Sequence, residues 1–168
     1  MGTKNISFKN TSLDVDMGKY LSRHDIVYLS PATEGYEGLH VGNGDMGAMT
    51  WTPPDKIHFQ INKCDTWDDA EPGQFGAWED SGNPDKAERF TALRSCGEIS
   101  IAPGLPVFDW MYLEDFRGRL SLGKAQVDWL AKGPLGLVEC QAFVSREPGV
   151  LAIHYNDKLS EAVTRRVD

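Results

Sequence analysis

The sequence predicts an all-β fold, an antiparallel two-sheet β-sandwich. Three observations carry this prediction: apolar residues recur at every second position, turn-forming residues separate the alternating segments, and helix start and stop signals frame a single segment. Alternation with period two places the apolar side chains on one face of a strand, and that face needs a second layer to cover it.

The clearest strands lie in the middle and in the second half of the chain. Ile57, Phe59 and Ile61 alternate with polar residues, and residues 138–144 show the same pattern. Further strands are expected over 97–102, 117–122, 125–130 and 150–155, with turns at Gly123-Lys124, Lys132-Gly133-Pro134 and Glu147-Pro148-Gly149. Because short turns join antiparallel neighbours, the second half is predicted to form a meander.

Two segments in the middle depart from this pattern. Asn83 as a cap, Pro84 at the first helical position and Gly97 beyond the end predict a helix of a turn or two at most. Residues 65–82 lack periodicity and are rich in Asp, Glu, Gly and Pro, which predicts a long loop. Two tryptophans, Trp67 and Trp78, indicate that this loop is functional rather than disordered.

The 168 residues, 40% of them hydrophobic, suit one globular domain. We divide the chain into a partly flexible N-terminal extension, residues 1–24, and the N-terminal part of a β-sandwich domain, residues 25–168. No closing return strand is recognisable near the C-terminal end, so we expect the sandwich to be truncated there.

Charge and hydropathy narrow the range of partners. The net charge is -8 and no basic run occurs, which disfavours binding to nucleic acid. Every apolar run is too short to span a membrane, and residues 1–12 lack the apolar centre of a signal peptide. Neither a nucleic acid nor a membrane is therefore expected as a partner.

Metal, cofactor and thiol chemistry are also not expected. The four histidines lack a metal-ligand spacing, and Cys64, Cys96 and Cys140 are an odd number at wide intervals. We interpret the cysteines as buried thiols, and we predict neither a metal nor a cofactor.

A glycine-rich segment, residues 41–47, contains the spacing G-x-G-x-x-G of dinucleotide-binding loops. Such a loop must lead into a long helix, but Pro53 and Pro54 occur almost at once after it. The glycines are better explained by a tight turn between two strands, with Asn43 and Asp45 bonding nearby backbone groups. The turn could still border a ligand.

Tryptophan side chains can bind sugars, and pairs of carboxyl groups can cleave them. Trp51 and Trp129 fall on strand patterns and are expected in the core, whereas Trp67 and Trp78 can stack on a sugar. Glycoside hydrolysis needs two carboxyl groups, one of them with a raised pKa. An acidic loop in solvent does not raise the pKa of its carboxyl groups. We nominate no catalytic residue.

Residues 39–49, LHVGNGDMGAM, followed by IHFQIN at 57–62 and then Trp67, resemble the opening of glycoside hydrolase family 95 in order and spacing. A related family, domain-of-unknown-function family 5703, is more similar still, with the runs NKCDTWDD, LRSCG, VFDWMYLEDFRGRL and FVSREPGVLAIHY. The resemblance begins near Asp25 and covers most of the chain after that residue.

This resemblance implies a large two-sheet sandwich followed by a linker and an (α/α)6 barrel that holds the catalytic carboxylate. Family 95 enzymes hydrolyse α-L-fucosides and α-L-galactosides with inversion, and a full-length parent of that family would be extracellular or periplasmic. Asn62 and Trp67 match the family stretch Asn-Glu-Asp-Thr-Leu-Trp, but Lys63, Cys64 and Asp65 replace its Glu, Asp and Thr.

The leading hypothesis is therefore a non-catalytic sandwich domain of a glycan-degrading enzyme, which borders the active site of the barrel. Its partners would be a glycan and the barrel, and its substrate-binding residues would be Asn43, Asp45, Asn62, Asp65, Trp67 and Trp78. Two alternatives remain: a freestanding carbohydrate-binding module and a purely structural docking domain.

Overall fold

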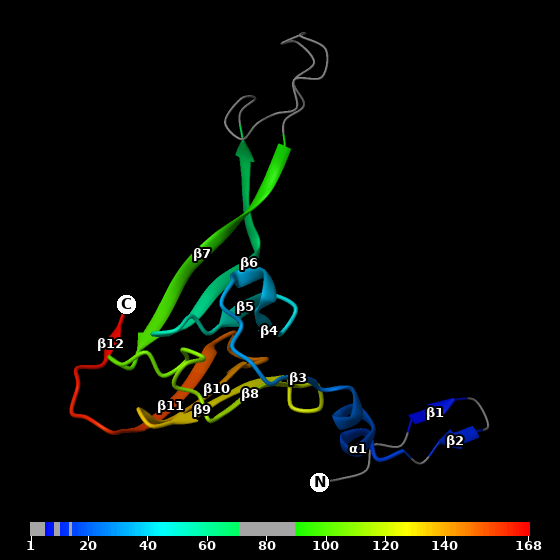
Figure 1. The fold of residues 1–168 in the computed structure, drawn as a ribbon. Helices are drawn as coiled ribbons and strands as arrows, with labels where there is room; N and C mark the ends of the chain where they lie inside the picture. The colour runs from blue at the N-terminus through cyan, green and yellow to red at the C-terminus, as the bar shows by residue number, and fades with distance from the viewer. Residues whose placement is uncertain (1–5, 9–10, 14, 71–89) are drawn as a thin grey trace, which may run out of the picture.

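A computed structural model describes residues 6–8, 11–13, 15–70 and 90–168. Within these residues, two antiparallel sheets of five strands each pack against one another, which confirms the predicted all-β sandwich. A hairpin of β1 (Ile6–Phe8) and β2 (Thr11–Leu13) and a short helix, α1 (Met17–Leu21), lie to one side of the sandwich (Figure 1). A 3-10 turn, η1 (Ser22–His24), comes directly after α1.

One sheet, here called the β8–β11 sheet, has the strand order β11-β10-β9-β8-β3. Its strands are β3 (Ile26–Tyr28), β8 (Asp115–Ser121), β9 (Gln126–Gly133), β10 (Gly136–Val144) and β11 (Leu151–Leu159). Strands β8 to β11 pair in sequence order, so the predicted meander is confirmed.

The second sheet, here called the β4–β7 sheet, has the order β12-β7-β6-β5-β4. Its strands are β4 (Leu39–Gly42), β5 (Met46–Trp51), β6 (Ile57–Ala70), β7 (Phe90–Ala102) and β12 (Arg166–Val167), and η2 (Gly35–Glu37) precedes β4. The expectation that no strand returns near the end was wrong, because Arg166 pairs with Ala102 and Val167 with Ile101.

Strands β6 and β7 form a long twisted ribbon that extends beyond the sandwich (Figure 1). Two predictions here were wrong: residues 65–70, predicted as loop, continue β6, and residues 90–96, predicted within the short helical segment, belong to β7. Pairing between the strands, such as Trp67 with Leu93, outweighs the weak local helix signal, because an isolated helical turn is unstable. The start of the predicted helix, with Asn83 as its cap and Pro84 as its first residue, lies outside the described residues.

The core lies between the two sheets. Burial alternates along β9 and β10, as the sequence pattern predicts. Phe59 of β6 is fully buried, and Trp129 of β9, predicted in the core, is 2% exposed. The two sheets are also joined by a hydrogen bond, because Nε1 of Trp129 donates to Oγ1 of Thr50 at 3.1 Å. Trp51 is only half-buried and stacks on His58, with ring centroids 5.0 Å apart.

Candidate functional site

The glycine-rich segment forms the hairpin between β4 and β5, in agreement with its interpretation as a tight turn. Oδ1 of Asn43 accepts hydrogen bonds from the backbone N–H groups of Asp45 at 2.9 Å and Met46 at 2.8 Å. Gly44 has a φ of 97°, in the left-handed region that favours glycine. The Asn-Gly pair thus shapes the turn and fixes the position of Asp45.

The same turn contacts the loop between β10 and β11, so the two sheets meet at this end of the sandwich. Nδ2 of Asn43 donates to the carbonyl of Ser145 at 2.8 Å. A β-carbon on Gly149 would lie 3.4 Å from Nδ2 of Asn43 and 4.0 Å from Oδ2 of Asp45. The amide of Asn43 therefore has three hydrogen bonds within the protein and acts mainly as a structural link.

The pairing of β6 with β5 brings a second set of side chains to this turn. Lys63 pairs with Met46, and in the same register the N–H of Cys64 donates to the carbonyl of Asp45 at 2.8 Å. On its other side, β6 shifts its pairing with β7 between Asn62 and Trp67. Oγ1 of Thr66 donates to the carbonyl of Lys63 at 2.7 Å. Such irregularities bend a strand and redirect its side chains.

We call Asn43, Asp45, Lys63, Cys64, Asp65 and Trp67 the Trp67 cluster. Its charged centre is Lys63, whose Nζ lies 2.6 Å from Oδ2 of Asp65 and 3.4 Å from Oδ1 of Asp45. The hydrogen bond from Lys63 lowers the pKa of Asp65, and the bond to Asp65 raises the pKa of Lys63. All three side chains are exposed, so water and salt screen the pair and its contribution to stability is small.

Trp67 supplies the apolar surface of the cluster. Its side chain is 57% exposed, although an indole usually buries most of its surface. Nε1 donates to the carbonyl of Cys64 at 2.6 Å, which fixes the ring relative to the irregular part of β6. An indole held in place beside carboxylates and an ammonium group can stack on a sugar while the polar groups bind its hydroxyls.

The interpretation of all three cysteines as buried was wrong for two of them. Cys140 is buried, and burial raises the pKa of its thiol to about 12, but Cys64 and Cys96 are exposed. Cys64 donates its S–H to Oδ1 of Asp45 at 3.2 Å, and this bond raises the pKa of the thiol. A nucleophilic cysteine needs the opposite shift, so Cys64 is not activated for covalent catalysis.

The structure brings together four of the six residues expected to bind substrate: Asn43, Asp45, Asp65 and Trp67. Asn62 is adjacent in β6, paired with Gly47, and Trp78 lies outside the described residues. Sequence reasoning did not select Lys63 or Cys64 as members of the site. Their contacts with Asp45 follow from the pairing of β6 with β5, in which Lys63 lies opposite Met46, and residue type and spacing alone do not indicate that register.

Comparison with protein-family models finds no match for this chain. A search of curated proteins finds no similar sequence either. Among the described residues, no group of three His, Cys, Asp or Glu side chains is arranged to hold a metal ion. No helix in the described part of the chain is long and apolar enough to cross a membrane.

Proposed function

We propose that this chain is a non-catalytic β-sandwich domain of a carbohydrate-active enzyme similar to glycoside hydrolase family 95. In this proposal the Trp67 cluster borders the sugar-binding surface of a neighbouring (α/α)6 barrel. The two-sheet architecture agrees with what the sequence resemblance implies, and the residues of the resembling motif gather at one end of the sandwich.

The observation that carries the proposal is the exposed indole of Trp67, which donates to the carbonyl of Cys64, the residue between the charged residues Lys63 and Asp65. An exposed tryptophan with a fixed ring loses little conformational entropy when a ligand stacks on it. Sugar recognition uses this combination of an apolar face and surrounding polar groups.

The chemistry of the cluster supports a binding role rather than a catalytic one. Inverting glycosidases need one carboxylic acid that stays protonated near neutral pH and can donate its proton. Asp65 has the opposite character, because the hydrogen bond from Lys63 lowers its pKa. The ammonium group of Lys63 also contacts Asp45, so neither carboxylate sits in the apolar surroundings that a catalytic acid requires.

The proposal is tested by Trp67→Ala in the full gene product, with α-L-fucosides and α-L-galactosides as substrates. We expect kcat/KM to fall by about tenfold, which corresponds to about 1.4 kcal/mol of lost transition-state stabilisation. The unfolding transition should not change, because the indole is largely exposed.

Trp110→Ala is the matched control, because Trp110 is 79% exposed in the β7–β8 loop and lies outside the cluster. It should leave the kinetics unchanged. Unaltered kinetics in the Trp67 variant, or a gene product without a barrel domain, would contradict the proposal.

The exposure of Trp67 also favours a second candidate function, a freestanding carbohydrate-binding module. In that case the chain alone would bind neutral oligosaccharides in a saturable way, and Trp67→Ala would remove the binding while Trp110→Ala would not. Titration of the isolated chain therefore distinguishes the two candidates.

A further inference from the structure

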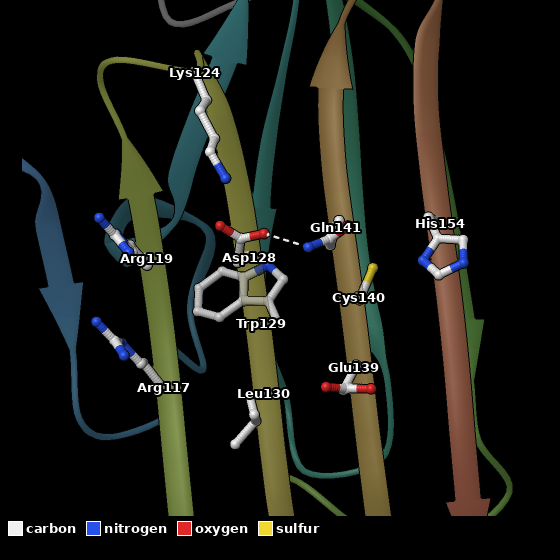
Figure 2. A pocket seen from close by; sticks show the side chains of 10 residues that line it. All are labelled: Arg117, Arg119, Lys124, Asp128, Trp129, Leu130, Glu139, Cys140, Gln141 and His154. Atoms are coloured by element: carbon white, nitrogen blue, oxygen red, sulfur yellow. Dashed lines mark hydrogen bonds between the residues drawn. The ribbon is translucent and has the colours of Figure 1, made fainter. Parts of the chain in front are cut away.

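The outer face of the β8–β11 sheet carries a groove of about 470 Å³ that is separate from the Trp67 cluster (Figure 2). This volume falls within the range of small-molecule sites. Side chains of β8, β9, β10 and β11 line the groove, and Lys124 in the β8–β9 turn extends along β9 toward Asp128 (Figure 2). Trp67 lies on β6 in the other sheet, so the groove and the cluster can be tested independently.

Strand register arranges the side chains of the groove in two parallel rows. One row runs from Arg117 through Leu130 to Glu139, and the other from Arg119 through Asp128 and Gln141 to His154. Neighbouring strands lie about 4.8 Å apart, so the backbone positions of Arg117 and Glu139 are separated by roughly 10 Å. Leu130 lies between them. The row thus presents a cation, an apolar side chain and a hydrogen-bond acceptor, in this order, on three neighbouring strands.

Hydrogen bonds within the groove show which groups are already engaged. Nε of Arg119 donates to Oδ2 of Asp25 at 2.9 Å. Nε2 of Gln141 donates to Oδ1 of Asp128 at 2.9 Å, as the dashed line in Figure 2 shows. Nδ2 of Asn156 donates to Oε2 of Glu139 at 3.2 Å, which leaves the other carboxylate oxygen available. Arg117 is exposed and makes no hydrogen bond or ion pair with another residue in the described ranges.

From this arrangement we propose that the groove binds a carboxylate-bearing saccharide, such as a hexuronic acid residue. The free guanidinium of Arg117 presents two parallel N–H groups that match a carboxylate. Leu130 contacts the C–H face of the sugar ring, and Glu139 accepts hydrogen bonds from its hydroxyl groups. Asp128 and Glu139 add negative charge to the groove, so a short saccharide whose carboxylates stand among hydroxyl groups fits better than a densely sulfated or phosphorylated polymer.

The test is calorimetric titration of the chain with digalacturonate and with neutral galactobiose of the same linkage. We expect digalacturonate to bind at least about tenfold more tightly, and Arg117→Gln to remove this preference while galactobiose binding stays the same. Arg146→Gln, which removes an exposed cation from the β10–β11 loop, controls for net charge and should have no effect. Arg117→Lys should weaken digalacturonate binding to an intermediate extent, because it keeps the charge and loses the paired N–H groups.

Equal binding of the two sugars, or equal losses in the Arg117→Gln and Arg146→Gln variants, would overturn the proposal. Sulfate should not compete with digalacturonate, and efficient competition would also overturn it by showing a nonspecific anion site. Trp67→Ala should retain digalacturonate binding, so a failure of this proposal is distinguishable from a failure of the proposed function.

Discussion

Gly118 lies opposite Trp129 in the β8–β9 pair, where a side chain would collide with the indole. A β-carbon at this position would lie 2.2 Å from Cζ3 and 2.7 Å from Cε3 of Trp129. Trp129 is buried among tightly packed neighbours and cannot move aside without disturbing them. We therefore expect Gly118→Ala to lower the free energy of unfolding by about 1–3 kcal/mol, measured by urea denaturation.

Gly123→Ala is the matched control for this prediction. A β-carbon on Gly123 would meet Leu21 Cβ at 3.8 Å, which is an ordinary contact distance. The substitution should change the free energy of unfolding by less than about 0.5 kcal/mol. Equal losses for the two variants would show that contact with Trp129 is not the reason for glycine at position 118.

At the scale of elements, the short edge strand β3 is joined to the sheet by a carboxylate in addition to its backbone pairing with β8. Asp25, directly before β3, accepts hydrogen bonds from Nε of Arg119 and from the backbone N–H of Leu122, both at 2.9 Å. One side chain thus joins β3 to β8 and to the turn at the end of β8. The hydrogen bond from Arg119 lowers the pKa of Asp25 below its ordinary value of 3.8.

This shift determines how the contribution of Asp25 to stability depends on pH. A carboxylate with a lowered folded-state pKa stabilises the fold fully above its unfolded-state pKa of about 3.9, and this contribution is lost as pH falls through the folded-state pKa. Asp25→Asn should therefore lower the Tm at pH 7, and the difference from the wild type should shrink as the pH falls below about 3.9. Arg119→Gln should show the same dependence of Tm on pH as Asp25→Asn. A difference in Tm between variant and wild type that stays constant with pH would contradict this account.

Prediction from sequence succeeded for elements whose burial alternates and failed where pairing alone maintains a strand. Strands β9 and β10 bury every second residue, so the polar and apolar pattern is visible in the chain. The outer part of the β6–β7 ribbon extends past the sandwich and is held by cross-strand pairing, so no such pattern marks it. Asn43, Asp45 and Trp67 could be selected from their motif, whereas Lys63 enters the site through its pairing with Met46 beside the turn, which the residue pattern does not reveal.

At the scale of the whole molecule, the sandwich separates two surfaces with different chemistry. The Trp67 cluster lies at the end of the β4–β7 sheet with its exposed indole, and the groove lies on the outer face of the β8–β11 sheet with its free guanidinium. Residues of both rows in the groove alternate with buried core residues along β9 and β10. Packing between the sheets therefore fixes the geometry of the groove as well as the stability of the fold.

Two buried threonines allow the packing between the sheets to be tested. Thr50 accepts a hydrogen bond from Nε1 of Trp129 in the opposite sheet, so Thr50→Val leaves a buried indole N–H without an acceptor. This should lower the free energy of unfolding by about 1–3 kcal/mol, measured by urea denaturation with tryptophan fluorescence. Thr52 is equally buried, but its hydroxyl has no hydrogen-bond partner among the described residues, so Thr52→Val should be neutral or stabilising. If Thr52→Val were as destabilising as Thr50→Val, loss of the hydroxyl itself and not of the bond between the sheets would explain both effects.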